Sequence, residues 1–307
     1  MEVYQNSKEN TSGGPVALSL GMFDGVHLGH QSIIKKLKQR AESRNLRTGI
    51  LTFWPHPRLV FNPSDSLKLL TTLEEKKNRF ETLGIDFLQI QDFSEEFRNL
   101  SGTEFVEEIL VKRLKVKHLI VGYDHVFGKN RSGNFQLLES LAPKLGFEVE
   151  QMEAVNLHLE TISSTKIREA LEDGNIKEAN AMLGYDYSLS GTVVHGKKLG
   201  RTLGYPTANL EVSPLKLLPK KGAYIAEVFV NDKPYKGMLS IGTNPTVGGE
   251  SLTVEVNILD FNEDIYGESI EVHFKDFLHE EIDFEGLEPL KEKLKQDESK
   301  TREFFQD

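Results

Sequence analysis

Two histidines that flank a leucine and a glycine form the strongest chemical signal in the sequence. The segment 21–30 reads Gly-Met-Phe-Asp-Gly-Val-His-Leu-Gly-His; a short apolar run at 15–20 precedes it, and apolar residues at helical spacing follow. A helix that begins near Gly29 presents free N–H groups and the positive end of its dipole, and both attract phosphate. His27 and His30 can donate hydrogen bonds to phosphate oxygens there, and Gly29 lets a ligand approach the backbone. The segment therefore predicts a phosphate-binding turn.

Two other interpretations of this turn are open. It could be a plain strand-to-helix turn that carries two surface histidines, or His27 and His30 could form a metal pair. The pair makes a poor zinc site without a nearby cysteine or a placed carboxylate. The strand before the motif and the helix after it favour phosphate binding.

Hydroxyl groups and a guanidinium come together at residues 162–168, which read Ile-Ser-Ser-Thr-Lys-Ile-Arg. Ser164 and Thr165 would open a helix, and Arg168 would lie in its first turn. Hydroxyls, helix N–H groups and a guanidinium can together bind a polyphosphate. Taken alone, the segment is better explained as an ordinary Ser/Thr N-cap with a surface arginine, but together with the histidine turn it favours polyphosphate binding.

A glycine-rich stretch, residues 196–209, holds a third set of polar groups and ends in Tyr-Pro-Thr-Ala-Asn. Its glycines indicate a tight loop near a ligand, and Pro206 stiffens the approach to Thr207. Thr207 and Asn209 offer oxygen atoms, the hard ligands that Mg²⁺ prefers. The alternative is a glycine-rich hairpin loop without a ligand.

These segments are carried by two different kinds of secondary structure. Strand-like runs alternate with helical patterns in the first half, which predicts a parallel sheet with helices on both faces. After Gly184 short strand-like runs with few helices predict a small antiparallel barrel or sandwich, and two helical segments, 164–172 and 176–183, join the halves. We expect domains at 1–184 and 185–307. The expected strands are 15–20, 48–53, 87–90, 118–122, 189–195, 222–230, 235–241, 253–259 and 269–274, and the other expected helices are 33–41, 72–83, 102–114 and 287–304.

Composition excludes several classes of protein. The chain has 307 residues, enough for roughly two domains, and a net charge of −10, which argues against a general nucleic-acid scaffold. Cysteine is absent, so disulfide scaffolds, thiolate zinc sites and a cysteine nucleophile are excluded. No apolar run is long enough to span a membrane, and residues 1–6 do not resemble a signal peptide. We expect a cytoplasmic protein with small-molecule partners, without nucleic-acid or membrane partners, that is a monomer or a weak homo-oligomer.

The turn at 21–30 resembles that of the HxGH nucleotidylyltransferases, and the whole chain resembles the bacterial bifunctional riboflavin kinase / FAD synthetase family. The resemblance extends from about Val16 to the C-terminal helical segment. The matching segments are 23–31, 55–57, 121–124 with 127–128, 163–168, 200–209, 241–246, 254–255 and 259–261.

The resemblance implies a Rossmann-like α/β nucleotidyltransferase domain followed by a mainly β riboflavin-kinase barrel. It implies two reactions: riboflavin and ATP give FMN, and FMN and ATP give FAD and pyrophosphate, with Mg²⁺ as cofactor. By motif match, Thr207 and Asn209 would hold Mg²⁺, and Glu255 would take the proton from the ribityl hydroxyl. By sequence alone Glu255 is more simply an outward-facing strand residue. His27 and His30 would be catalytic in the first domain, and Asp124 would contact flavin or nucleotide unless it is only a turn residue. The remaining nucleotide-binding residues implied by the match are Phe23, Asp24, Gly25, Gly29, Ser164, Thr165, Arg168 and Gly204.

Four positions depart from the family pattern. Met22 stands in place of Asn, His125 and Val126 in place of Phe and a basic residue, and His279 in place of Arg. The first three bear on adenylyl transfer and the fourth on the kinase. Two rival functions follow: a riboflavin kinase whose first domain no longer adenylylates, and a flavin-binding regulatory protein without turnover. The intact His27, Thr207 and Glu255 argue against the second.

Overall fold

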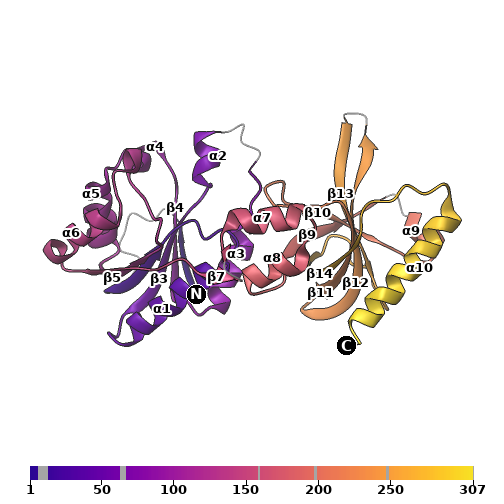
Figure 1. The fold of residues 1–307 in the computed structure, drawn as a ribbon, viewed down its shortest axis with the longest axis horizontal. Coiled ribbons are helices and arrows are strands. Elements are labelled where there is room, and N and C mark those ends of the chain that lie inside the picture. Colours follow the sequence, from indigo (N-terminus) through magenta and orange to yellow (C-terminus); the bar gives the residue numbers. More distant parts are fainter. Residues whose placement is uncertain (6–12, 63–66, 158–159, 197–198, 247–248, 307) are drawn as a thin grey trace. The chain divides into compact units, whose positions relative to one another are not determined.

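The computed structural model describes residues 1–5, 13–62, 67–157, 160–196, 199–246 and 249–306. These residues form two compact units, Met1–Ser163 and Ser164–Asp307, each built around its own sheet (Figure 1). No helix in these ranges is long and apolar enough to cross a membrane.

A six-stranded parallel sheet organises the first unit, as the alternating pattern predicts. The strands lie in the order β1-β4-β3-β2-β5-β6, so the chain leaves β2 toward one edge and later returns to build the other edge from β5. Ligands of such sheets bind at the carboxyl ends of the strands where the order switches, here β2 and β5. The strands are β1 (Glu2–Gln5), β2 (Val16–Leu20), β3 (Arg47–Phe53), β4 (Phe87–Gln91), β5 (Val116–Val121) and β6 (Glu148–Gln151).

The two outer strands, β1 and β6, are not among those that the sequence predicts. Neither strand contains a buried residue, so hydrophobic periodicity gives them little signal. The four predicted strands are all present, and β2 and β4 are buried along their whole length, as strands covered on both faces should be.

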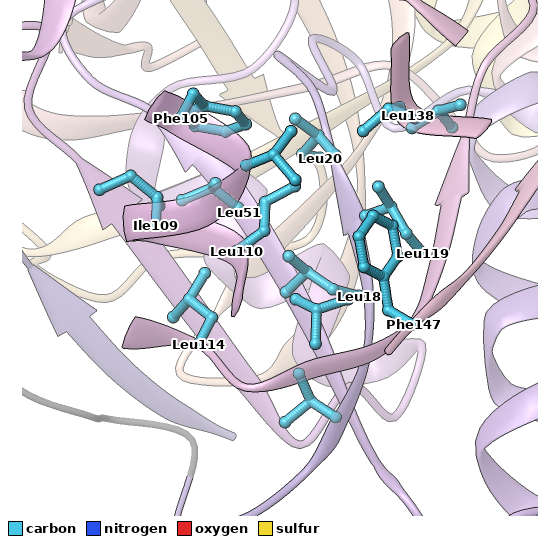
Figure 2. Packing of buried hydrophobic residues seen from close by; sticks show 14 of the residues in the cluster. Leu18, Leu20, Leu51, Phe105, Ile109, Leu110, Leu114, Leu119, Leu138 and Phe147 are labelled. Atoms are coloured by element: carbon cyan, nitrogen blue, oxygen red, sulfur yellow. The ribbon is translucent and has the colours of Figure 1, made fainter. Parts of the chain in front are cut away.

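Helices cover both faces of this sheet. The helices α1 (Leu28–Glu42) and α3 (Leu73–Thr82) pack on one face. The other face is covered by η1 (Phe105–Arg113) and α6 (Phe135–Leu145), whose apolar side chains meet Leu18 and Leu119 of the sheet (Figure 2). The smaller elements are α2 (Pro57–Phe61), α4 (Glu95–Arg98), α5 (Gly102–Glu104), η2 (Lys129–Arg131) and the hairpin of β7 (Asn156–Leu157) and β8 (Glu160–Thr161).

The helix that the sequence predicts at 102–114 is present with a different winding. After the single turn of α5 it continues as a π-helix, and the amide of Leu114 donates to the carbonyl of Ile109, five residues earlier. Apolar spacing does not distinguish this winding from an ordinary α-helix.

A closed six-stranded barrel forms the body of the second unit, which decides between the barrel and the sandwich in favour of the barrel. Its strands follow the order β10-β13-β12-β11-β14-β9, and all neighbouring pairs are antiparallel. The elements are β9 (Ser188–Val194), α9 (Leu199–Leu203), β10 (Ala208–Val212), β11 (Gly222–Val230), β12 (Lys233–Thr246), β13 (Gly249–Ile258), β14 (Ser269–His279) and α10 (Leu287–Phe304). The short α9 and the strand β10 are not among the elements that the sequence predicts, and neither is α6 of the first unit.

Two helices, α7 (Ser164–Glu172) and α8 (Ile176–Leu183), belong to the same compact unit as the barrel. Asn180 of α8 donates to the carbonyl of Phe274 in β14 over 2.9 Å and accepts from the amide of Tyr187 over 2.7 Å. The compact division of the chain therefore falls before α7. The functional division that the sequence predicts, between residues 184 and 185, is a separate property and stays a prediction.

Candidate active sites

The first predicted turn lies at the start of α1, at the switch point of the parallel sheet. His27 is the residue before the helix, with extended backbone angles, and His30 lies in the first turn. The two imidazole rings stack with centroids 3.7 Å apart and planes 19° apart. His27 is only 7% exposed, so it is not a surface residue. Both Nδ1 atoms are buried and have no hydrogen-bond partner within the described part of the chain.

The imidazoles are uncharged at neutral pH. Burial lowers the pKa of His27 to about 4, and Asp24 opposes part of this shift. Burial also lowers the pKa of His30 well below its usual value, with further lowering from His27 and Lys76. The described residues contain no group of three His, Cys, Asp or Glu side chains that could hold a metal ion, so no third ligand supports the metal-pair interpretation.

Asp24 anchors the turn to a loop that the sequence analysis did not single out. Its buried carboxylate accepts hydrogen bonds from the amides of Leu70, at 3.2 Å, and Thr71, at 3.1 Å. The Thr71 hydroxyl in turn accepts from the amide of Gly25 over 3.1 Å. One signal pointed to this loop: Thr72 and Glu75 form the capping box of α3, a spacing readable in the sequence. The hydrogen bonds between this loop and Asp24, which lies 46 residues before Leu70, could not be predicted from the sequence.

The backbone of the turn is strained. Phe23 and Val26 adopt φ of 50° and 37°, angles that cost a β-branched or bulky residue free energy. Tertiary packing holds them there, because both side chains are buried and the Phe23 ring lies edge-on to His30 at 5.0 Å. Gly25 takes φ of 81° without such a cost. Because tertiary packing holds these strained angles, the turn has one defined conformation.

The loop after β5 lies beside α1, as the neighbouring positions of β2 and β5 require. A Cβ atom placed on Gly122 would lie 3.7 Å from an Asp124 carboxylate oxygen and 3.9 Å from Ile33 of α1. Asp124 is thus exposed at the same edge of the sheet as the histidine turn. His125, one of the departures, stacks on Phe127, and its buried Nε2 has no partner within the described ranges. Val126 is 41% exposed.

The second predicted phosphate-binding segment opens α7. Ser164 is the first residue of the helix, Thr165 is exposed, and Arg168 follows in the next turn. The segment starts the second compact unit, whereas His27 and His30 belong to the first. A shared role of these residues in one nucleotide site stays a prediction.

The barrel brings together the three residues predicted for the kinase site. The Thr207 hydroxyl donates to the Glu255 carboxylate over 3.2 Å, and Asn209 of β10 is paired directly with Glu255 of β13. Glu255 thus has a side-chain partner in the predicted site, unlike a strand residue that merely faces solvent. Because the Thr207 hydroxyl donates its hydrogen to Glu255, its lone pairs are available to a cation.

Close approach explains the glycines that line this site. A Cβ atom on Gly196 would lie 2.2 Å from the Asn209 amide nitrogen, and one on Gly200 would lie 2.1 Å from the Tyr205 carbonyl oxygen. Gly200 excludes any larger residue because its neighbour is backbone, whereas a larger residue at Gly196 would displace the Asn209 side chain. Gly204 adopts φ of 84° with open space around it, so its requirement is conformational.

A chain of hydrogen bonds that the sequence analysis missed ties this loop to α10. The Tyr205 hydroxyl donates to Glu298 over 2.8 Å, and Glu298 accepts from Arg302 over 2.8 Å. Arg302 also holds Asp260, just after β13, through two parallel 2.8 Å bonds. Asn257 adds a 2.7 Å bond to the carbonyl preceding Thr207. Apart from Glu298 and Arg302, which are four residues apart on α10, these partners lie far apart in the sequence, so no local pattern could reveal them.

His279, which stands where the family pattern has arginine, makes another contact with α10. Its Nε2 lies 2.8 Å from the carboxylate of Asp297, a side chain only 6% exposed, and Lys293 binds the same carboxylate. His279 therefore connects the end of β14 to α10.

Comparison with known proteins matches each unit to a family. Residues 9–166 match the family model of FAD synthetase, and residues 183–305 match that of riboflavin kinase. The chain is 43% identical over 290 residues to the bifunctional riboflavin kinase/FMN adenylyltransferase of Listeria monocytogenes. It is 38% identical over 291 residues to that of Escherichia coli; both alignments cover 94% of this chain and 92% of the relative. A crystal structure from Streptococcus pneumoniae, described as a macrolide-efflux protein, matches with a TM-score of 0.90 at 33% identity, covering 98% of this chain and 99% of that one.

Proposed function

This chain belongs to the bifunctional riboflavin kinase/FMN adenylyltransferase family, and from that membership we propose that its two clusters of polar residues are two separate reaction sites. The protein is a bifunctional transferase: it phosphorylates riboflavin to FMN and converts FMN to FAD. We assign FMN formation to the barrel and FAD formation to the parallel-sheet unit, with the histidine turn at its centre.

In the barrel, Glu255 acts as the general base. The ribityl hydroxyl of riboflavin attacks the γ-phosphorus of ATP, its proton passes to the Glu255 carboxylate, and ADP leaves. An alcohol is a weak nucleophile, so a base is useful here. The convergence of Thr207, Asn209 and Glu255, with the 3.2 Å bond between Thr207 and Glu255, is the single observation that carries this assignment.

The donor set of the barrel site fits a magnesium ion, because it consists of hydroxyl, amide and carboxylate oxygens. Thr207 and Asn209 would hold the ion, and it would neutralise phosphate charge. Thr207 would then have two tasks: its hydrogen orients Glu255, and its oxygen would be a ligand of the ion.

In the parallel-sheet unit, His27 and His30 are hydrogen-bond donors to the phosphates of ATP. An FMN phosphate oxygen attacks the α-phosphorus, and the bond to the departing pyrophosphate breaks. The attacking oxygen is already ionised, so this step needs no base, and catalysis consists of alignment and charge stabilisation. Gly29 and the free N–H groups at the start of α1 complete this cradle. Ser164, Thr165 and Arg168 would add further donors, and Asp124 would contact the flavin or nucleotide.

One assay tests the assignment as a whole. The purified protein is incubated with riboflavin, ATP and Mg²⁺, and the flavins are separated over time. FMN should appear first and FAD should follow at its expense. FMN without FAD would mean an impaired adenylyl transfer, and no product would mean a flavin-binding protein without turnover. The cytoplasmic location and the monomeric or weakly associating state stay predictions.

A further inference from the structure

A buried lysine lies beneath the histidine turn and has no part in the mechanism above. Lys76 of α3 is 2% exposed, and its ammonium donates to the carbonyl of Met22 over 2.7 Å. The Thr52 hydroxyl donates to the same carbonyl over 3.3 Å. Lysine is almost never fully buried unless it is paired, because removing an ammonium from water is costly. The burial of the Lys76 ammonium therefore calls for a functional explanation.

The geometry of α3 aims this ammonium at the turn. Lys76 and Phe80 are four residues apart and so lie on one face of the helix. Phe80 packs edge-on against Phe23 at 5.5 Å, and Phe23 packs on its other side against His30 at 5.0 Å. Phe23 of the strained turn thus contacts both α3, through Phe80, and α1, through His30.

The ionisable groups around this turn are few, and backbone groups hold the two charged ones. Lys76, His27 and His30 are three basic groups, and Asp24 is the acidic group that acts on Lys76 and His27. The Asp24 carboxylate is already hydrogen-bonded to the 70–71 backbone. Glu75, next to Lys76 on α3, is engaged with the amide of Thr72 at the helix start. Because the imidazoles are uncharged at neutral pH, the Lys76 ammonium and the Asp24 carboxylate balance each other, and both are held by backbone groups of the turn and its neighbouring loop.

We propose that Lys76 is a positioning residue of the adenylyl-transfer site, whose buried ammonium fixes the Met22 carbonyl and so the turn that presents His27 and His30 to the triphosphate of ATP. This inference rests on the proposed function of the histidine turn. In the free enzyme burial is the main cause that lowers the pKa of both imidazoles, and the Lys76 ammonium adds to the lowering at His30, so each ring is neutral and keeps one N–H for a phosphate oxygen. Once the triphosphate binds, the same ammonium is a fixed positive charge that needs no reorganisation.

The titration behaviour of these groups agrees with this arrangement. Burial lowers the pKa of Lys76 to about 8, and Asp24 limits the shift. Lys76 is therefore mostly charged at pH 7 and loses its charge above about pH 8. Its charge is one of the causes that hold the pKa of His30 down. Removing the ammonium should raise the pKa of His30.

The test compares Lys76→Met with Lys76→Arg, which keeps the charge, and with Lys77→Met, which removes the next lysine and its surface pair with Glu74. The imidazole signals are titrated by NMR in histidine-labelled protein. We expect Lys76→Met to raise the pKa of His30, because one of the causes that lower it is removed. Adenylyl transfer at pH 7 should fall by roughly tenfold to a hundredfold, in kcat more than in KM for FMN. Lys76→Arg should restore most of both, and riboflavin phosphorylation by the same preparations should be unchanged.

An unchanged His30 titration in folded Lys76→Met, an equal loss of both activities, or no rescue by Lys76→Arg would overturn the proposal. Should Lys76→Met fail to fold, the wild-type protein decides the matter: the His30 signal should shift with an apparent pKa near 8 as Lys76 loses its proton, and a flat signal overturns the idea. If the wild-type protein makes no FAD, the proposed function fails, whereas the NMR titration still reports on Lys76.

Discussion

In the first unit the side chains that we propose for the reaction are buried, neutral imidazoles at a helix N-terminus, whereas those that we propose in the barrel are hydrogen-bonded oxygens at neighbouring strands. The histidine turn comes from ten consecutive residues whose strained backbone is held by packing. The barrel site joins segments about fifty residues apart through strand register. The difference follows the chemistry: an ionised phosphate needs only donors and alignment, but an alcohol needs a base and a cation.

Glu255→Gln should have the largest effect, because it should stop one of the two reactions and leave the other intact. Glutamine keeps the size of the side chain and can still accept from Thr207, but it cannot take a proton at neutral pH. Riboflavin phosphorylation should fall about 10²–10⁴-fold. FMN added directly should become FAD at the normal rate. Both half-reactions are measured on one preparation, with the exposed Glu211→Gln of β10 as control; near-normal FMN formation by Glu255→Gln would return Glu255 to an ordinary strand residue.

Removing α7 and α8 from the barrel should cost several kcal/mol of stability, because each fully buried large apolar side chain contributes about 1.5–3 kcal/mol. Leu171, Ile176 and Leu183 are all buried. Fragments 164–307 and 186–307 should both make FMN and no FAD, and the shorter one should unfold at lower urea. Equal midpoints would show that the helices add nothing to the barrel. Failure of a folded 164–307 fragment to phosphorylate riboflavin would refute the assignment of the kinase to this unit.

His30→Ala should damage the other reaction. Loss of a donor that stabilises the transition state costs on the order of 10²-fold in rate. FAD formation should fall by about this factor, and FMN formation should not change. The two rates are compared in one reaction mixture. An equal loss of both in a well-folded variant would contradict two separate sites.

Mild acid should destabilise the parallel-sheet unit. The folded-state pKa of His27 is about 4, below the value of 6.5 of the unfolded chain, so the unfolded state binds more protons between these values. Stability is therefore lost as pH falls from about 6.5 toward 4, by about 2 kcal/mol at pH 5 from this residue alone. His125, with a pKa of about 4, acts in the same direction. The only tryptophan, Trp54, lies in this unit, so urea unfolding followed by its fluorescence at pH 7 and pH 5 measures the effect. An unchanged midpoint would show that the imidazoles are not protonated more readily on unfolding.

Tyr205→Phe should have the smallest effect. It removes the hydrogen bond to Glu298 and leaves the ring, a change of about 1 kcal/mol. We expect a few-fold rise in KM for ATP in the kinase reaction, because the loop that carries Thr207 is less well held, and no change in adenylyl transfer. The matched control is Tyr4→Phe, which removes another tyrosine–glutamate bond, in β1 of the first unit. If both variants behave alike, α10 does not position the kinase loop.

Local patterns were enough to predict much of this protein. Apolar periodicity located the buried strands β2 to β5 and the main barrel strands. A strand that is buried on one or both faces has apolar residues at alternate positions or along its whole length. The order strand, glycine turn, helix placed His27 and His30 at a helix N-terminus, because all the interactions that define this turn type lie within a few residues. No such apolar pattern distinguishes the exposed edge strands β1 and β6 or the π-helical winding of η1.

Other features were decided only by the tertiary structure. The sequence named Thr207, Asn209 and Glu255 by resemblance, but the antiparallel register of β10 and β13 joins them into one site. Burial of Lys76 contradicts what a lysine in an amphipathic helix predicts. The tie between Tyr205 and α10 spans 93 residues. The physical reason is common to these cases: periodicity reports which face of an element is apolar, whereas hydrogen bonds and ion pairs depend on which distant segment that face meets.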